Sequence, residues 1–273
     1  MQIDVSHPGD PRLADYVGLS DPELRRRVEG DGGFFVAEGP LVVRALLGTE
    51  HRVRSVLVTP QQRAALADVL DPLAHTGIPV YVVTPETMRG TVGFDLHRGA
   101  VAAADRAPLR DFDSVLDGAT RVALLERVND HENLGALFRN AAAFGVDAVL
   151  LCPQCSDPLY RRTVRVSIGH VLRVPWTRAA PWPDAITRVR DRGFTVLALT
   201  PDAEAQRIDA VDVPDEQPLA MLLGAEGPGL SPAAAGRADA RVRIPMAAGV
   251  DSLNVAVAAA VAFARFAPER ART

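Results

Sequence analysis

The fold of this chain is decided by residues 121–151, which read RVALLERVNDHENLGALFRNAAAFGVDAVLL. Residues 122–125 and 148–151 are apolar runs typical of buried strands, and residues 134–144 carry apolar side chains at helical spacing. A strand, a helix and a second strand in this order predict two parallel strands joined by a crossover helix. The chain is therefore expected to contain an α/β domain.

The same alternation continues to the carboxyl end. The predicted strands there are 172–175, 195–199, 219–223 and 242–244, and the predicted helices are 158–168, 183–192 and 252–266. Asn133 is predicted to cap the helix 134–144, Gly145 to end it, and Asp251 or Ser252 to cap the last helix. Helices between successive strands predict a mostly parallel sheet covered on both faces. Such sheets bind ligands in the loops that follow the carboxyl ends of their strands.

A smaller α/β unit is predicted to precede this domain, because the chain is long enough for two domains. Its predicted strands are 34–36, 53–58, 80–83 and 100–104, and its predicted helices are 40–47, 61–74 and 85–89. The predicted organisation is a loose arm at 1–20, a smaller α/β domain at 21–105, a linker at 106–119 and a larger domain at 120–273. The arm is expected from its polar composition with Pro8 and Pro11, and the linker from its lack of a sustained period.

Composition and charge narrow the classes of protein. The chain has 48% apolar and 23% charged residues, as an ordinary soluble globular protein does. Its longest apolar stretch, 255–263, is too short to span a bilayer, and no secretory signal pattern begins the sequence, so a cytoplasmic location is expected. The net charge of −4 argues against binding nucleic acid through overall charge. All 30 basic residues are Arg, which reflects either compositional bias or the use of Arg to grip phosphate.

The two cysteines stand close together in Cys152-Pro153-Gln154-Cys155. A C-x-x-C pattern is either a redox pair or an incidental pair of buried thiols. Two cysteines alone cannot make a four-ligand zinc site, and no metal is predicted.

Three loop-and-helix segments, each just after a predicted strand, carry candidate chemistry. The first, 133–145, places Arg139 on a helix one turn after a glycine; the second, 222–231, places three glycines around Glu226; the third, 244–258, is a glycine-containing loop that leads into a helix of Ala and Val. Taken singly, each has an ordinary structural interpretation: a solvated Arg, a turn before a capped surface helix, and a buried helix with its cap.

Taken together and in this order, the three segments resemble the SpoU/TrmH branch of the SPOUT RNA methyltransferases. The first motif is matched by Asn133, Gly135, Arg139, Ala141, Phe144 and Gly145. The second is matched by Gly224, Glu226, Gly229 and Leu230, and the third by Ile244, Pro245, Met246, Gly249 and 252–255. The resemblance extends from about residue 121 to the end. The amino-terminal unit resembles, less specifically, the family's small substrate-binding domain at Phe35–Gly39, at 56–58 and at His97-Arg98-Gly99, where the family often has Gln in place of Arg98.

The resemblance implies a fold and a reaction. The fold is a SPOUT-type parallel sheet with a carboxyl-terminal trefoil knot, and the family is dimeric. The reaction is transfer of a methyl group from S-adenosyl-L-methionine to a ribose 2′-hydroxyl of structured RNA, either ribosomal or transfer RNA. The implied cofactor-binding residues are Leu199, Thr200, Gly224, Glu226, Gly229, Ile244, Met246, Ser252 and Leu253.

The resemblance also implies catalytic roles for Arg139, Asn133, Glu226, Ser252 and Asn254. The family assigns the central role, sometimes that of the base, to the Arg at the position of Arg139. Because a guanidinium group is effectively always protonated, we expect it instead to orient a phosphate and to stabilise developing alkoxide charge. Asn133 is expected to orient that Arg or the nucleotide, and Glu226 to hold an Arg or to shape its loop. Ser252 and Asn254 are expected to fix the knot and the substrate ribose.

RNA contact is expected from clusters of Arg. The candidates are Arg25, Arg26, Arg27, Arg98, Arg161, Arg162 and Arg165. For each run the alternative is a solvated helical face. Because aromatic residues make up only 5% of the chain, extensive base stacking is not expected. Two other classes of protein remain open at this point: a non-catalytic RNA-binding or ribosome-assembly protein that keeps the fold, and a C-x-x-C oxidoreductase.

Overall fold

The structure, a computed structural model, describes residues 1–22, 30, 33–96 and 98–268. The chain forms two compact units. Unit 1 contains residues 1–108 and 159–172, and unit 2 contains residues 109–158 and 173–273. The segment 159–172, which was expected within the carboxyl-terminal domain, is therefore part of unit 1.

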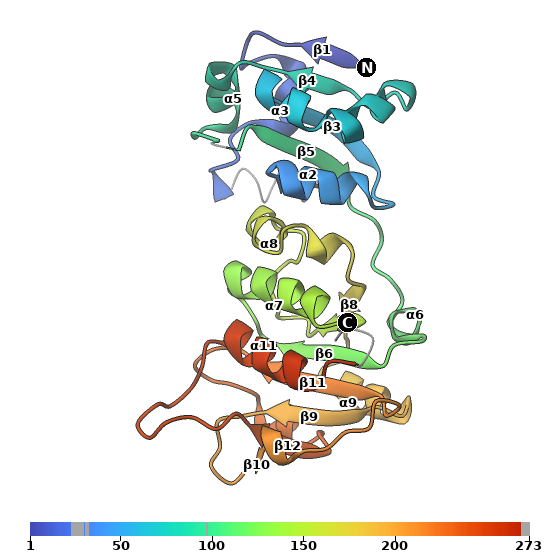
Figure 1. Ribbon diagram of the computed structural model, residues 1–273, viewed down its shortest axis with the longest axis vertical. Helices are drawn as coiled ribbons and strands as arrows, with labels where there is room; N and C mark the ends of the chain where they lie inside the picture. The colour runs from blue at the N-terminus through green and yellow to red at the C-terminus, as the bar shows by residue number, and fades with distance from the viewer. Residues whose placement is uncertain (23–29, 31–32, 97, 269–273) are drawn as a thin grey trace. The chain divides into compact units, whose positions relative to one another are not determined.

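Unit 2 is built on a seven-stranded sheet in which every pairing is parallel (Figure 1). The strand order is β10-β12-β9-β11-β6-β7-β8. The strands are β6 Arg121–Glu126, β7 Ala148–Leu151, β8 Trp176–Arg178, β9 Thr195–Leu199, β10 Gln206–Arg207, β11 Leu219–Gly224 and β12 Ala240–Arg243. The predicted parallel α/β sheet is thus confirmed, whereas the trefoil knot stays a prediction. The strand predicted at 172–175 is wrong: β8 begins one residue after Pro175, which has no N–H to donate to a ladder.

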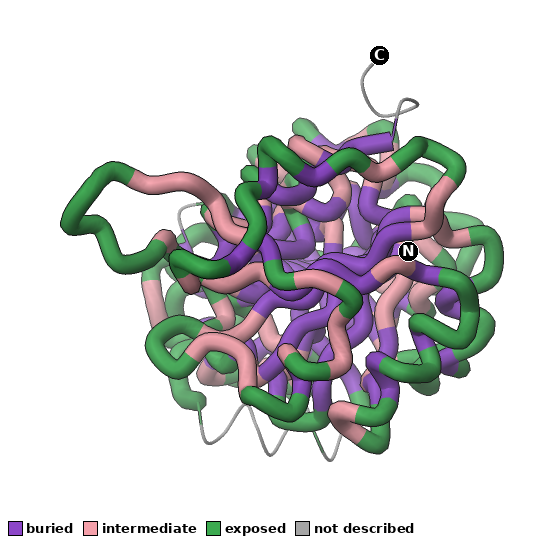
Figure 2. Tube along the Cα trace, turned by 90° about the horizontal axis from the view of Figure 1, so that it is seen from below, coloured by how far each residue is buried: buried purple, intermediate pink, exposed green. Residues whose placement is uncertain are grey.

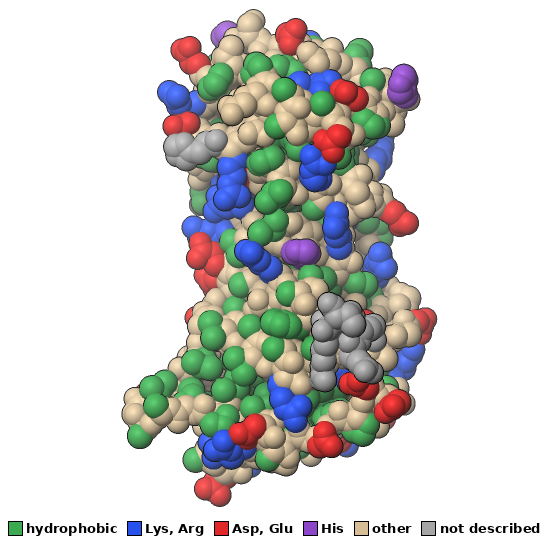
Figure 3. All heavy atoms as spheres, in the orientation of Figure 1, with side chains coloured by type: hydrophobic (Ala, Val, Ile, Leu, Met, Phe, Trp, Pro, Cys, Tyr) green, Lys and Arg blue, Asp and Glu red, His purple; other side chains and the backbone are tan. Residues whose placement is uncertain are grey.

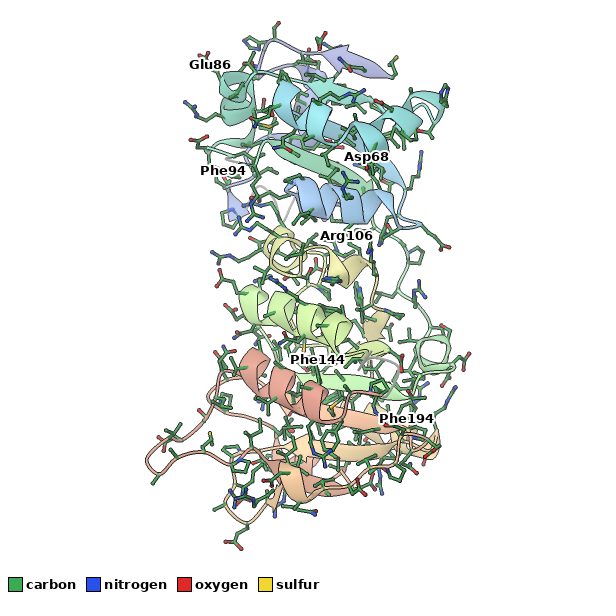
Figure 4. The ribbon with its side chains drawn as sticks, viewed as in Figure 1. Asp68, Glu86, Phe94, Arg106, Phe144 and Phe194 are labelled. Atoms are coloured by element: carbon green, nitrogen blue, oxygen red, sulfur yellow. The ribbon has the colours of Figure 1, made fainter. Side chains whose placement is uncertain are left out.

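Helices cover both faces of this sheet. They are α6 Phe112–Leu116, α7 His131–Ala143, α9 Asp184–Asp191, α10 Pro232–Ala235 and α11 Val255–Arg265, with a 3-10 turn, η4, at Ile208–Ala210. Side chains of α6, α9 and α10 pack with one face of the central strands in a single buried cluster. α7 and α11 lie side by side on the other face (Figure 1), and Phe144 lies at the carboxyl end of α7 (Figure 4). In Figure 2 the buried segments gather near the centre of the view, and the exposed segments lie mostly around its rim.

Two predicted helix caps are wrong, and the true caps lie nearby. α7 begins at His131 because the side chain of Asp130 accepts a hydrogen bond from the backbone N–H of Asn133 at 2.8 Å. Asn133 therefore lies in the first turn. α11 is capped by Asn254, whose Oδ1 accepts from Ala256 N at 2.9 Å, so Asp251 and Ser252 lie in the preceding loop. In each case a short polar side chain satisfies N–H groups that the helix itself leaves open.

Unit 1 contains a mixed five-stranded sheet in the order β1-β4-β3-β5-β2, with β5 antiparallel to both neighbours. Its strands are β1 Gln2–Asp4, β2 Phe34–Glu38, β3 Val53–Val58, β4 Val80–Val82 and β5 Ala100–Asp105. Its helices are α2 Pro40–Leu47, α3 Pro60–Ala65, α4 Ala67–Leu70, α5 Pro85–Val92 and α8 Arg161–Val166, and its 3-10 turns are η1 Pro11–Tyr16, η2 Asp71–His75 and η3 His170–Leu172.

Two predictions about local structure in unit 1 are wrong. Residues 1–20 are not a loose arm, because β1 pairs with β4 and the apolar side chains of Leu13, Tyr16 and Leu19 are buried. The helix predicted at 61–74 is broken at Leu66, and it ends as an α-helix at Leu70 because Pro72 cannot donate the hydrogen bond that a continuous helix needs. In unit 2, the linker predicted at 106–119 contains α6, whose first turn is capped by the side chain of Asp111.

Two features are absent from the described part of the chain. None of its helices is long and apolar enough to cross a membrane. Among the same residues, no group of three or more His, Cys, Asp and Glu side chains is arranged to hold a metal ion.

Candidate active site

The candidate active site is a cavity of about 340 Å³ in unit 2. Its wall comes from the segments that follow three neighbouring strands, β9, β11 and β12. The residues that were predicted to bind the cofactor all line it: Leu199, Thr200, Gly224, Glu226, Gly229, Ile244, Met246, Ser252 and Leu253. The loop after β12 extends away from the sheet (Figure 1), and residues 247–252 within it are exposed. The segments converge because parallel strands end at one edge of their sheet.

The loop after β11 folds back sharply on itself, and this requires glycine at two positions. A Cβ atom at Gly224 would lie 2.4 Å from Gly229 C and from Leu230 N, so no larger residue fits there. Gly229 has a φ of +64°, which side chains disfavour, and its N–H donates to the Ala225 carbonyl at 3.1 Å. The loop therefore presents backbone groups and Glu226 directly to the cavity.

A hydrogen-bonded polar cluster joins two of the loops to α7. Asn254 Nδ2 donates to Glu226 Oε1 at 2.5 Å and to Asn133 Oδ1 at 2.8 Å. Glu226 Oε1 also accepts from the backbone N–H of Val255 at 3.4 Å. The structure thus brings together three of the five residues predicted to be catalytic, one from each of the three motifs. Two of them, Asn133 and Asn254, are 121 residues apart in the sequence. The cluster fixes the start of α11 against the start of α7.

The other two residues predicted to be catalytic lie outside this cluster. Ser252 lines the cavity from the exposed loop before α11. Arg139 is exposed on α7 and is not part of the cavity wall. Among the described residues nothing forms a hydrogen bond or ion pair with the Arg139 guanidinium. Its neighbour Asn140 instead ties α7 to α11, donating to the Ala256 carbonyl at 2.8 Å. Arg139 is therefore accessible to a group that approaches from outside the cavity.

One residue that sequence reasoning missed, Glu126, holds the far end of the loop after β11. Glu126, at the end of β6, is buried, with a relative exposure of 3%. It accepts from Ser231 N and Ser231 Oγ, both at 2.7 Å, and from Trp182 Nε1 at 2.8 Å. The signal in the sequence was a carboxylate directly after the apolar run 122–125. A buried carboxylate needs hydrogen-bond donors such as these.

The Arg residues predicted to bind RNA fall into three groups. Arg25, Arg26 and Arg27 lie outside the described residues. Arg98 and Arg162 are exposed in unit 1. The remaining two, on α8, form ion pairs with one carboxylate of unit 1, Glu38, which is 5% exposed.

The geometry of that carboxylate changes the expectation for Arg161 and Arg165. Arg161 Nη1 lies 2.5 Å from Glu38 Oε2, and Arg165 Nη1 lies 3.2 Å from Glu38 Oε1. The Arg161 guanidinium also stacks on Phe94, 5.2 Å from the ring centroid. Both side chains compensate a buried charge within unit 1, which the linear sequence could not reveal because Glu38 is more than 120 residues away.

Cys152 and Cys155 are both buried free thiols at the end of β7, with their Sγ atoms 3.7 Å apart. The hydrogen bond from the Cys155 thiol lowers the pKa of Cys152 from its ordinary value to about 6. That same hydrogen bond, together with burial, raises the pKa of Cys155. Arg178 donates to the Cys155 carbonyl at 2.6 Å and to the Ser156 carbonyl at 2.9 Å, which fixes the turn. This arrangement favours a structural role over exchange with external thiols.

An all-parallel sheet with a cavity at its carboxyl edge identifies unit 2 as a small-ligand-binding α/β domain. The family model of the SpoU rRNA Methylase family matches residues 120–264. An uncharacterized tRNA/rRNA methyltransferase of Mycobacterium tuberculosis is 46% identical over 261 residues, which cover 95% of this chain and 90% of the relative. The chain belongs to the SpoU rRNA Methylase family, which confirms the resemblance in the three motifs.

Two further relatives are more distant. A 23S rRNA (guanosine-2'-O-)-methyltransferase of Ralstonia nicotianae is 32% identical over 200 residues, covering 72% of this chain and 79% of the relative. The crystal structure of an AdoMet-bound rRNA methyltransferase from Sinorhizobium meliloti superimposes with a TM-score of 0.79 at 26% identity, covering 97% of each chain. The similarity to that structure extends over both units of the chain.

Proposed function

We propose that this protein transfers a methyl group from S-adenosylmethionine to a ribose 2′-hydroxyl of structured ribosomal or transfer RNA. The observation that carries the proposal is the convergence of the loops after β9, β11 and β12 on one cavity beside Asn133 and Asn254. The AdoMet-bound relative and the guanosine-2'-O-methyltransferase relative support the donor and the acceptor atom respectively.

The cavity fits the proposed donor in size and in chemistry. Its volume of about 340 Å³ lies in the range of small-molecule sites. Leu199, Ile244 and Leu253 offer apolar surface for an adenine ring, and the backbone at Thr200 and Gly224 offers donors and acceptors for the adenine and ribose. When bound, S-adenosylmethionine supplies a methyl group already activated by its positive sulfur, so the protein's own residues need only position the acceptor and stabilise its charge.

The acceptor side of the reaction is assigned to residues outside the cavity wall. Arg139 orients a phosphate of the RNA and stabilises negative charge that develops on the ribose oxygen, which its exposed and unpaired guanidinium can do directly. The hydrogen-bonded cluster of Asn133, Asn254 and Glu226 fixes the loops of the cavity, in which the donor binds, against the start of α7. We assign contacts with the substrates to Ser252 because it lines the cavity from the exposed loop before α11. Alignment of the hydroxyl with the methyl group is then the main catalytic contribution.

Unit 1 is assigned the role of RNA-binding domain. Arg98 and Arg162 are its exposed candidates, and the run Arg25, Arg26 and Arg27 adds positive charge in the same part of the chain. Arg161 and Arg165 are not assigned to RNA, because both guanidinium groups are held by the buried carboxylate of Glu38. We also assign a homodimer, since α11 exposes an apolar face in unit 2.

The test is incubation of the purified protein with methyl-labelled S-adenosylmethionine and with separate preparations of ribosomal and transfer RNA. We expect label in one RNA, at a nucleotide that resists alkaline cleavage because its 2′-hydroxyl is methylated. Label on a base would contradict the ribose assignment. A calorimetric titration that shows no binding of S-adenosylmethionine would contradict the proposal entirely and favour a non-catalytic RNA-binding protein.

A further inference from the structure

Arg127, which immediately follows the central strand β6, occupies an unusual backbone position. Its φ is +55°, and of the described non-glycine residues only Arg127 and Ile168 have a positive φ. Holding a side chain there costs about 1 kcal/mol or more, and such strain concentrates at functional sites. A glycine would occupy this position without that cost. We take the positive φ of Arg127 as an indication that its side chain has a role.

The Arg127 side chain lies against the outer side of the loop that closes the cavity. Glu126 is paired with Gly224 in the sheet, so Arg127 begins its loop directly beside the loop after β11. Its Nη2 donates to the Gly229 carbonyl at 3.4 Å, longer than the usual N–H···O distance of about 2.9–3.0 Å. Gly229 belongs to the cavity wall, whereas Arg127 does not. The guanidinium thus stands next to the donor site but outside it.

This guanidinium is poorly satisfied where it stands. Its Nε is buried and has no hydrogen-bond partner. No carboxylate within the described part of the chain forms an ion pair with it. Arg178, also in unit 2, differs in that its guanidinium donates to the carbonyls of Cys152, Cys155 and Ser156. Because a half-buried cation without an anion is unfavourable, the Arg127 side chain is suited to accept one.

We propose that Arg127 binds a backbone phosphate of the RNA next to the ribose that is methylated. This inference rests on the proposed function, in which the donor fills the cavity and the acceptor approaches from outside it. An anion that reaches Arg127 comes from that outer side, and the anions that flank a ribose are its phosphates. The planar fork of donors on a guanidinium matches two phosphate oxygens. Arg127 and Arg139 would then hold the RNA from the two ends of the segment that joins β6 to the body of α7.

The test compares Arg127→Gly and Arg127→Lys with the wild type in RNA binding at several salt concentrations. Arg127→Gly removes the guanidinium but suits a φ of +55°, so its melting temperature should hold or rise. We expect about tenfold weaker RNA binding, as for loss of a charged hydrogen bond. The slope of log K against log salt should fall by about 0.7–0.9, the contribution of one phosphate contact. Arg127→Lys should keep the slope and recover part of the affinity.

The control is Arg192→Gln, which also removes one positive charge from unit 2 but takes it from ion pairs with Asp113 and Asp117. It should leave RNA affinity and the salt slope unchanged. Unchanged RNA binding by Arg127→Gly would overturn the inference while wild-type methyl transfer still supports the proposed function. Weaker binding of S-adenosylmethionine by Arg127→Gly, with RNA binding intact, would also overturn it and would identify the anion as the donor's carboxylate. If the wild type transfers no methyl group at all, the proposed function fails first.

Discussion

At the scale of single residues, the site separates groups that face the cavity from groups that face outward. Glu226 and Asn254 line the cavity and hydrogen-bond to each other. Arg139 and Arg127 lie outside its wall and lack carboxylate partners among the described residues. This division matches a reaction with two substrates, one enclosed and one delivered from outside. Substitutions on the two sides should therefore affect different binding steps.

Arg139→Ala is expected to abolish methyl transfer while leaving the binding of S-adenosylmethionine largely intact. The reason is that Arg139 does not line the cavity, so its loss should remove only the stabilisation of the acceptor oxygen that we propose for it. A single oxyanion donor of this kind contributes about 10²–10³-fold in rate. Single-turnover transfer and calorimetric titration with the donor measure the two effects. Near-normal transfer by this variant would refute the role given to Arg139.

Asn254 caps α11 with its side-chain oxygen and binds Glu226 and Asn133 with its side-chain nitrogen, and two substitutions can separate these roles. Asn254→Ser keeps an oxygen that can cap α11 but removes the Nδ2 group that donates to Glu226 and Asn133. We expect weaker donor binding with little loss of stability. Asn254→Ala loses the cap as well, so its free energy of unfolding should fall by about a further 1 kcal/mol. Denaturant unfolding and donor titration measure the two quantities; equal donor affinity in the wild type and in Asn254→Ser would show that the cluster does not shape the cavity.

The thiol pair provides a test of the oxidoreductase alternative. Replacement of both Cys152 and Cys155 by Ser should leave methyl transfer active, because neither thiol lines the cavity. In the wild type, thiolate absorbance should appear as the pH rises through about 6, the lowered pKa of Cys152. Because this pKa is depressed in the folded state, its contribution to stability is present above the unfolded value and is lost as the pH falls through about 6. Loss of transfer in the double variant at full stability would restore the thiols as candidates.

At the scale of secondary structure, periodicity and glycine placement predicted the elements well, and long-range pairing explains what they missed. The strand predicted at 195–199 has the same bounds as β9, since an unbroken run of apolar or β-branched residues, 194–199, follows Gly193. β1 was missed because three residues of mixed polarity form a strand only when β4 supplies the partner. The cap at Asn254 was missed because three polar residues compete for it and the contact with Glu226 selects one.

In the candidate site, too, local sequence motifs could be recognised, whereas contacts between distant parts of the chain could not be predicted. The residues that line the cavity could be predicted because three motifs resemble those of a known family, and each motif follows a strand of one parallel sheet. The pairing of Arg161 and Arg165 with Glu38 could not, because it depends on the segment 159–172 packing in unit 1. The strain at Arg127 could not be predicted either, because nothing in the sequence marks a positive φ at a residue other than glycine.

Arg121 joins the first strand of the large sheet to its last helix. Its buried guanidinium donates to the Phe266 carbonyl at 2.8 Å, beyond the end of α11, and to the Gln217 carbonyl at 3.0 Å. Arg121→Met keeps much of the volume but leaves these carbonyls unsatisfied, so the free energy of unfolding should fall by about 3 kcal/mol or more. Arg192→Met, at an exposed position, should change it little. Equal unfolding midpoints in denaturant for the two variants would contradict this role.

At the scale of the whole molecule, the proposed homodimer requires an exposed apolar face. Val257 and Val261 are 50% and 39% exposed on α11, four residues apart and thus on one face of the helix. Figure 3 shows apolar side chains gathered over the part of unit 2 where α7 and α11 lie. Burial of such a patch against a second copy removes it from water, and exposed apolar clusters of this kind mark protein interfaces.

Val257→Glu is therefore expected to convert a homodimer into a monomer and to lower methyl transfer, because it places a charge in a desolvated interface. Light scattering should give twice the chain mass of 29.2 kDa for the wild type and the single chain mass for the variant. Leu109→Glu is the matched control: Leu109 is 55% exposed but lies before α6, away from α11 in the sequence, so dimer and activity should persist. Since Val257 adjoins Ala258, which lines the cavity, a dimer formed here would bring a second chain close to the donor site. A monomeric wild type with full activity would remove both the interface and that consequence.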